Sequence, residues 1–296
     1  MSKQLSVIIL SYNTVNTTKE CLDALVASLS EYPTFQAEII VVDNASEDGS
    51  KDMIKEYKKS FESDHILFTS ISNIDNEGFP KGNNRGLHNA SGEYILFMNS
   101  DVIVGSLNWP SIVQYLEKNK NIGALTVKVQ LPSKRIDLAS HRGFPSLWNS
   151  FTYFTQLERL TYIIPQIGRV FGGYHLTHYN FNTIHKVDAI SGAFFMAPKK
   201  VLDEMDGFDE EFFMYGEDVD LAYRMKEKGY DVVYYPKFTV THLKYQSGFK
   251  NKKAHHKTKE YYHNAMRIFY RKHYADKHSS MVNSFVYLFI DIKSKI

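Results

Sequence analysis

Cysteine is almost absent from this chain of 296 residues, which contains Cys21 alone. A single cysteine excludes an intrachain disulfide framework and is typical of a protein that works in a reducing compartment. Cys21 stands within an apolar pattern of helical spacing. We therefore expect a buried thiol, with a reactive thiol as the alternative.

Long hydrophobic runs are also missing near the N-terminus. The apolar run there covers only residues 7–10, far fewer than the apolar region of a signal peptide or a membrane-spanning helix needs. This pattern predicts a cytoplasmic protein, or one bound to the inner face of the cell membrane.

The sequence has no excess of one charge and no glycine-rich phosphate-binding motif. The net charge is +2 at pH 7, so no overall field favours a polyanion, and nucleic acid is not expected as a partner. No G-x-G-x-x-G follows the first predicted strand, and no G-x-x-x-x-G-K-[ST] occurs. A bound nucleotide must therefore be held in another way.

Apolar and aromatic residues are plentiful. Hydrophobic residues make up 43% of the chain, which has 20 Tyr and 20 Phe. The length allows one large domain, or one domain with a small extension. The aromatic content suits both a large core and contacts to a ring-shaped or amphiphilic ligand.

Apolar runs alternate with helical patterns through the first hundred residues. The first helix is predicted to begin in a capping box formed by Thr17 and Glu20. This alternation predicts a parallel sheet flanked by helices. Strands are predicted at residues 5–10, 38–43, 65–71, 94–98 and 231–235, and helices over residues 50–59, up to 90 and over 219–228.

Polar clusters stand where three of these strands end, at residues 11–13, 43–46 and 99–101. Ligands of open α/β sheets bind beyond the carboxyl ends of the strands. Asn, Asp and Ser are also ordinary turn residues, so loop capping is the alternative for any one cluster. Three clusters at one edge together predict a ligand site.

Residues 141–185 are irregular and aromatic, without a single period. This stretch is interpreted as an insertion or lid over the site, with a peripheral membrane contact as the alternative.

Seven segments occur in the order seen in glycosyltransferase family 2: LSVIILSYN, IIVVDNASEDGS, NEGFPKGNNRG, YILFMNSDV, SGAFFMAPKKV, GFDEEFFMYGEDVDLAYR and THLKYQSG. Over about residues 5–248 the chain resembles the rhamnosyltransferase-like branch of that family. The resemblance implies the GT-A fold, an α/β fold with a Rossmann-like, mostly parallel central sheet flanked by helices. It also implies inverting transfer from a nucleotide-activated sugar. We expect a catalytic domain at 1–249, with the insertion at 141–185, and a helical extension at 250–296.

The triplet Asn99, Ser100 and Asp101 ends the strand that begins at residue 94. Asp101 can bind a hard divalent cation through oxygen. The resemblance makes Asp101 and His242 the ligands of Mg²⁺ or Mn²⁺ and places Asn99 and Ser100 near the ribose. An Asn at position 99 can still hydrogen-bond a ribose hydroxyl, so the triplet is compatible with an active enzyme. A structural histidine at a strand end is the alternative for His242.

Asp43, at the end of the second predicted strand, can accept the N3 proton of uracil or thymine, which cytosine cannot offer at neutral pH. A solvated turn residue is the alternative. The resemblance implies that the loop after Gly82 lines the nucleotide and diphosphate, with Arg85 suited to a bidentate anion contact. The other expected nucleotide contacts are Ser11, Asn13, Asn44 and Asn83.

Three acids, Glu217, Asp218 and Asp220, open a predicted helix. The helix dipole favours acids in a first turn, so N-terminal capping is the alternative for any one of them. The resemblance places the catalytic base at Asp218, with Glu217 orienting the acceptor. One carboxylate suffices for inversion by single displacement. Asp220 is expected to be structural and paired with Arg224 at i+4.

Gly192 precedes the predicted strand "AFFMA". A small residue there would let the backbone approach the donor sugar, and close packing is the alternative.

The C-terminal part begins with a basic stretch, residues 250–259, that holds five Lys and two His. An aromatic helical pattern and an apolar run too short to span a bilayer follow. We expect attachment to an anionic membrane face, with a solvated charge run and a helix docked on the domain or on a second subunit as the alternative.

The expected function is extension of a cell-surface polysaccharide, or of a lipid-linked saccharide, from a nucleotide-sugar donor, with dTDP-rhamnose expected first. UDP-galactose, UDP-glucose or UDP-N-acetylglucosamine is the alternative donor. A non-catalytic nucleotide-sugar-binding protein is the alternative from another class.

Overall fold

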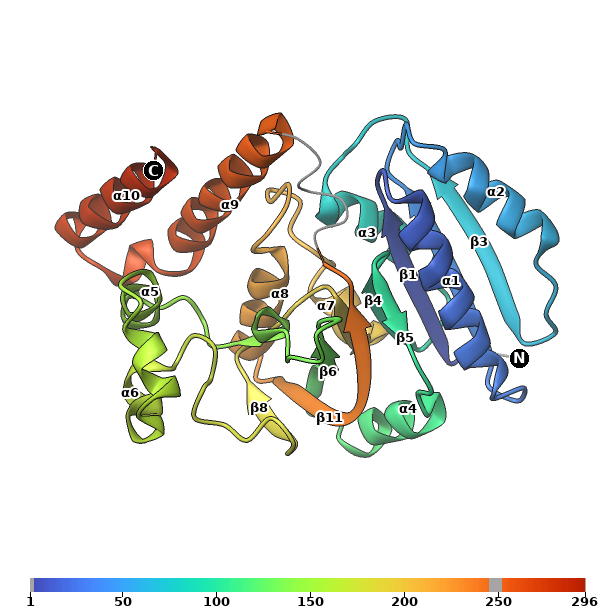
Figure 1. The fold of residues 1–296 in the computed structure, drawn as a ribbon, viewed down its shortest axis with the longest axis horizontal. Coiled ribbons are helices and arrows are strands. Elements are labelled where there is room, and N and C mark those ends of the chain that lie inside the picture. Colours follow the sequence, from blue (N-terminus) through green and yellow to red (C-terminus); the bar gives the residue numbers. More distant parts are fainter. Residues whose placement is uncertain (1–2, 245–251, 296) are drawn as a thin grey trace.

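The computed structural model describes residues 3–244 and 252–295. Its central feature is a nine-stranded sheet in the order β3-β2-β1-β4-β10-β6-β11-β5, with β8 paired to β11 (Figure 1). A separate small sheet pairs β7, His141–Arg142, with β9, Ala189–Ile190. The strands of the large sheet are β1 Leu5–Ser11, β2 Ala37–Asp43, β3 Ile66–Ser72, β4 Tyr94–Asn99, β5 Val102–Val104, β6 Ile122–Gln130, β8 His185–Val187, β10 Phe194–Pro198 and β11 Asp231–His242.

The first four strands form the parallel half of the sheet. Leu5 of β1 lies opposite Ala37 of β2 and Tyr94 of β4, and β2 continues in parallel to β3. This confirms the parallel sheet predicted from the alternating pattern. Beyond β4 the sheet is mixed, because β10 runs antiparallel to both β4 and β6, while β11 runs parallel to β6.

Helices cover both faces of the sheet because the strand side chains alternate between two buried clusters. Val7 and Ile9 pack with α1, α2 and α4, whereas Ile8 packs with α3, α7, α8 and α9. The helices are α1 Val15–Ser30, α2 Ser50–Ser60, α3 Phe79–Asn89, α4 Trp109–Lys118, α5 Leu147–Phe154, α6 Gly168–Phe171, α7 Lys199–Glu204, α8 Glu217–Glu227, α9 Lys252–His273 and α10 Ser280–Lys295.

Cys21 of α1 is fully buried in the first of these clusters. Burial raises the pKa of its thiol above the usual range. The buried thiol expected from the sequence is thus confirmed.

The start of α1 differs from the prediction. The helix begins at Val15, and the backbone N–H of Val15 is bonded to Oδ2 of Asp48 at 3.0 Å. The hydroxyl of Thr17 donates to the carbonyl of Thr14 at 3.2 Å, so Thr17 lies inside the first turn. The capping box of Thr17 and Glu20 is therefore wrong, because a loop 33 residues further along supplies the acceptor.

The helical C-terminal part packs on the α/β core through α9. Ala265, Ile268 and Phe269 join the buried cluster on the α8 face of the sheet. The predicted domain boundary at 249/250, the motif residues 245–248 and the first two residues of the basic stretch lie outside the described residues. Across 3–244 and 252–295, every helix is too short or too polar to cross a bilayer.

Candidate active site

A cavity of about 680 Å³ opens at the carboxyl edge of the sheet. Its volume is in the range of small-molecule sites. Leu10 of β1, Phe79 of α3 and Tyr261 of α9 contribute apolar and aromatic surface. The predicted residues that line it are Asn44, Asn99, Ser100, Asp101 and His242.

Asp43 is buried at the end of β2, directly before Asn44. Its Oδ2 accepts a hydrogen bond from the backbone N–H of Ser46 at 3.3 Å. Within the described part of the chain, Oδ1 is buried and has no hydrogen-bond partner. A buried acceptor without a partner is rare in a folded protein and points to a donor supplied by a ligand.

Asp101, in the turn between β4 and β5, and His242, the last residue of β11, converge at this cavity. Nε2 of His242 lies 3.2 Å from Oδ1 of Asp101, and Nδ1 lies 3.0 Å from Oδ2 of Asp137. Burial alone would lower the pKa of His242, but its hydrogen bonds to the two carboxylates raise that pKa to about 9. The cluster therefore already accommodates a positive charge between two acids.

This donor set fits the divalent cation expected from the sequence. One carboxylate oxygen and one imidazole nitrogen face each other, and a second carboxylate, Asp137, fixes the other ring nitrogen, as is usual for metal-bound histidine. In residues 3–244 and 252–295, no group of three or more His, Cys, Asp or Glu is arranged to hold a metal by itself. Asp101 and His242 thus remain predicted ligands that need oxygen atoms of a substrate or water to complete the site.

A second, smaller cavity of about 130 Å³ lies beside Glu217 and Asp218, and Tyr215 lines both cavities. Gly216 precedes α8 with a φ of 81°, a left-handed conformation that glycine adopts without strain. This turn places both acids in the first turn of α8. The remaining wall comes from α9 and from the predicted insertion, through Pro145, Ser150, Tyr153, Phe154 and Tyr174.

Asp218 is held from three sides. Arg142 of β7 donates through Nη2 to Oδ2 at 3.1 Å, and the backbone N–H groups of Gly192 and Val219 donate at 3.3 and 2.8 Å. A Cβ at Gly192 would lie 2.8 Å from the Phe79 ring, so a larger residue there would require the ring to shift. Burial alone would lower the pKa of Arg142, but Asp218 and Tyr174 raise it.

Glu217 is buried beside Asp218, and its Oε2 has no hydrogen-bond partner among the described residues. Burial, followed by the negative charge of Asp218, raises the pKa of Glu217 to about 8. At neutral pH this side chain is therefore a carboxylic acid that can donate a hydrogen bond.

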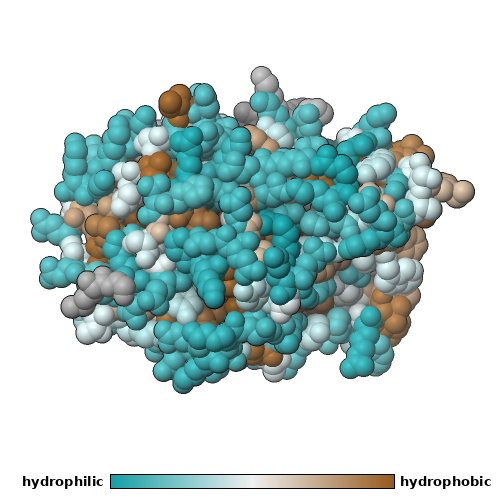
Figure 2. All heavy atoms as spheres, turned by 180° about the vertical axis from the view of Figure 1, so that it is seen from behind, coloured by the Kyte–Doolittle hydropathy of each residue, from teal (hydrophilic) through white to brown (hydrophobic). Residues whose placement is uncertain are grey.

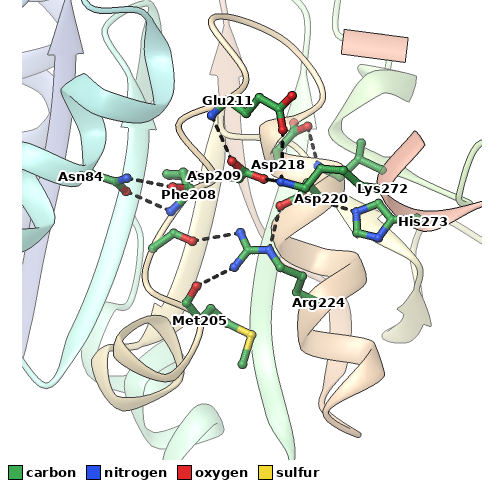
Figure 3. Close-up of polar contacts among 12 residues, drawn as sticks. Asn84, Met205, Phe208, Asp209, Glu211, Asp218, Asp220, Arg224, Lys272 and His273 are labelled. Carbon is green, nitrogen blue, oxygen red and sulfur yellow. Dashed lines mark hydrogen bonds and ion pairs between the residues drawn. The ribbon is translucent and has the colours of Figure 1, made fainter. Parts of the chain in front are cut away.

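Asp220 is fully buried, and Figure 3 shows its side chain in contact with Arg224 and His273. Its carboxylate accepts from Nε of Arg224 at 2.7 Å and lies 2.7 Å from Nε2 of His273. This confirms the predicted i+4 pair with Arg224 and shows that Asp220 anchors α9 to α8.

Five of the predicted nucleotide contacts, Asp43 among them, are not among the residues that line the cavity. The other four bond neighbouring parts of the chain. Ser11 bonds the hydroxyl of Thr18 at 3.0 Å, and Asn13 accepts from the backbone N–H of Glu47 at 2.8 Å, so both order the loop around Asp43. Asn83 donates to the carbonyl of Phe79, and Arg85 is half exposed and paired with Glu77 at 2.7 Å. These four residues stay predicted nucleotide contacts.

The sequence did not indicate four residues that the structure adds to the site. Lys244 and Lys257 line the larger cavity, where a cation suits a diphosphate, and Lys244 also pairs with Asp137 at 2.8 Å. Arg142 and Asp137 act on Asp218 and His242 from 76 and 105 residues away. A basic run was visible around Lys257, but no spacing signal links the other three to their partners.

Comparison with known proteins identifies the family. The model described as glycosyl transferase family 2 matches residues 6–179, more than half of the chain, and that of glycosyl transferase family group 2 matches residues 128–284. The chain belongs to glycosyl transferase family 2. The family resemblance stated from the sequence is thus confirmed, and its rhamnosyltransferase-like branch stays a prediction.

Curated relatives match this family 2 chain over part of their own length. It is 34% identical over 125 residues to poly(ribitol-phosphate) beta-glucosyltransferase of Bacillus spizizenii, covering 41% of this chain and 19% of the relative. It is 25% identical over 181 residues to rhamnosyltransferase WbbL of Escherichia coli, covering 60% of this chain and 59% of the relative. The chain therefore spans less than two thirds of either relative.

A solved structure confirms the GT-A fold of this family 2 chain. Mannosyltransferase PcManGT of Pyrobaculum calidifontis, in complex with GDP-Man and Mn²⁺, superposes with a TM-score of 0.61 at 16% identity, covering 95% of this chain and 66% of that one. At this identity the likeness concerns the fold alone.

Proposed function

We propose that this chain transfers a sugar, with inversion, from a nucleotide-sugar donor to a hydroxyl of a growing cell-surface polysaccharide or lipid-linked acceptor. The observation that carries the proposal is that two cavities share Tyr215 as a lining residue. The larger contains Asp101 and His242, and the smaller contains the acidic pair of α8. We infer that the donor binds in the larger cavity and the acceptor in the smaller one, on either side of Tyr215.

The proposed donor carries uracil or thymine, with dTDP-rhamnose first. The unpartnered Oδ1 of Asp43 supports a base with an N3 proton. The similarity to rhamnosyltransferase WbbL supports the sugar. A UDP-hexose or UDP-N-acetylhexosamine meets the same base requirement, and the similarity to a glucosyltransferase favours it as the second candidate.

The proposed reaction is a single displacement. The acceptor hydroxyl gives its proton to the Asp218 carboxylate while its oxygen forms the new bond to the anomeric carbon. The bond from that carbon to the diphosphate oxygen breaks, and its electron pair leaves with the diphosphate. Arg142 and the N–H of Gly192 hold the carboxylate in place, and protonated Glu217 donates a hydrogen bond that orients the acceptor.

Asp101 and His242 would hold Mg²⁺ or Mn²⁺ at the edge of the larger cavity. The bound cation would neutralise charge that develops on the departing diphosphate. Lys244 and Lys257 line the same cavity and add positive charge for the diphosphate.

The function is tested by release of nucleoside diphosphate from a panel of dTDP-, UDP-, GDP- and CDP-sugars, with Mg²⁺ or Mn²⁺ and with lipid-linked and simple glycoside acceptors. We expect one thymidine or uridine donor to be consumed, and chelation to abolish turnover. Release from a GDP- or CDP-sugar alone would overturn the donor assignment. Binding of a donor without acceptor-dependent release would favour a non-catalytic nucleotide-sugar-binding protein.

Asp43→Ala is expected to weaken UDP and dTDP binding by about tenfold to a hundredfold, because one hydrogen bond to a buried charged group is lost. CDP binding should change little, since cytosine has no N3 proton to offer. Isothermal titration with the three diphosphates measures both effects. Equal losses for all three would show that Asp43 supports the loop rather than the base.

A further inference from the structure

The insertion and α10 expose apolar side chains at the same end of the molecule. In Figure 2 brown atoms gather along the right-hand end, which is the end of α5, α6 and α10 in Figure 1. Phe154 of α5 and Phe289 of α10 are in ring contact at 5.2 Å, so the two segments, remote in sequence, form one surface. We call the exposed apolar residues of α5, of residues 157–171 and of α10 the end face: Leu147, Trp148, Phe151, Leu160, Tyr162, Ile163, Ile164, Val170, Met281, Phe285, Leu288, Phe289 and Ile292.

The apolar side chains of the end face have large solvent-exposed fractions. Ile163 is 78% exposed, Phe285 67% and Trp148 48%. On α10 the exposed positions recur at helical spacing from Met281 to Ile292, so the helix presents one apolar stripe to solvent. A patch of this extent on a folded chain marks an interaction site.

The charges around the end face are basic. Its two acids have partners, since Glu158 is 2.7 Å from Nδ1 of His175 and Asp291 pairs with Arg267. Lys293 extends over the rings of Phe154 and Phe289, at 5.6 and 5.8 Å from their centroids. The basic residues of these segments are Arg159, Arg169, Lys293 and Lys295.

We propose that the end face docks on an anionic lipid bilayer, with the apolar side chains in the headgroup region and the basic residues at the phosphates. Aromatic and aliphatic side chains bordered by Lys and Arg are the composition of an interfacial membrane surface. A second copy of the chain fits less well, because a two-fold contact would bring these cations against their own symmetry mates.

The same helix connects the end face to the proposed acceptor cavity. α5 exposes Leu147, Trp148 and Phe151, while Tyr153 and Phe154 line the smaller cavity. Docking thus places this cavity beside the bilayer surface, where the sugar of a lipid-linked acceptor would lie. This last step rests on the proposed function, whereas the docking itself needs no substrate.

Trp148 provides a direct readout. The chain has two Trp residues, and the other, Trp109, is fully buried in the core. Adding vesicles of phosphatidylcholine and phosphatidylglycerol to the full chain should shift Trp148 emission to the blue and sediment the protein. Vesicles of phosphatidylcholine alone, or high salt, should reduce binding about tenfold because the basic residues lose their attraction.

The test variant is Phe285→Ser with Leu288→Ser, for which we expect about tenfold weaker vesicle binding. The control is Leu67→Ser on β3, a leucine exposed at 49%, against 55% for Leu288, that lies on the far edge of the sheet. Circular dichroism checks that each variant is folded. Absence of vesicle binding, or equal losses in both variants, overturns the proposal. So does a dimer, measured by light scattering, that only the α10 variant disrupts.

Discussion

The Asp218→Asn variant is expected to transfer sugar about a thousandfold more slowly, within the range that a general base contributes. An amide keeps the shape of the side chain and can still contact Arg142, but it cannot take the acceptor proton. Donor binding should be unchanged, because Asp218 lines only the smaller cavity. Single-turnover kinetics and titration with nucleoside diphosphate separate the two effects.

Glu217→Gln is the matched control for this variant, because it makes the same chemical change at the neighbouring residue. Glu217 has a pKa of about 8 and is a neutral acid at pH 7, so an amide replaces it closely in shape and charge. We expect transfer to fall by less than about tenfold at pH 7. A larger loss in Glu217→Gln than in Asp218→Asn would reverse the two assigned roles.

The expected pH dependence of sugar transfer follows from the raised pKa of Glu217. Below pH 8 Glu217 holds its proton, and as the pH rises through 8 it ionises and brings a second negative charge beside Asp218. Transfer by the natural chain should therefore decline above pH 8. The Gln variant cannot ionise and should lack this alkaline limb.

The sequence predicted the half of the fold that depends on local pattern. Runs of branched apolar residues indicated β1 to β4, and the polar residues after them, including Asn44 and Asp101, do line one cavity. The pair of Asp220 and Arg224 could also be predicted from the sequence, because i+4 spacing on a helix brings the two side chains together.

The rest of the site depends on contacts between remote segments. Arg142 reaches Asp218, and Asp137 reaches His242, only after the sheet has assembled. Arg85 lies in a motif that predicted an anion contact. In the structure its guanidinium donates to the carboxylate of Glu77, eight residues earlier. The positions of the motifs thus indicated which elements form the site. The partner of each charged side chain could be identified only from the folded structure.

Arg142→Met tests the most consequential of these remote contacts. The Arg142 and Asp218 side chains are only 17% and 9% exposed. Removing one partner of such a pair leaves the other charge poorly compensated. We expect the free energy of unfolding to fall by about 2 kcal/mol, below the full cost for a completely buried pair because some solvent remains. Urea denaturation measures the change.

The double variant Arg142→Met with Asp218→Asn distinguishes pairing from packing. Once the carboxylate is neutral, the missing guanidinium no longer leaves a buried charge, so most of the lost stability should return while sugar transfer stays low. If the double variant is as unstable as the sum of its parts, the aliphatic portion of Arg142 supports the fold and the ion pair does not. Recovery would mean that the charge of Arg142 stabilises the fold mainly through its pair with Asp218. The proposed base would then be positioned by the segment that also walls the proposed acceptor cavity.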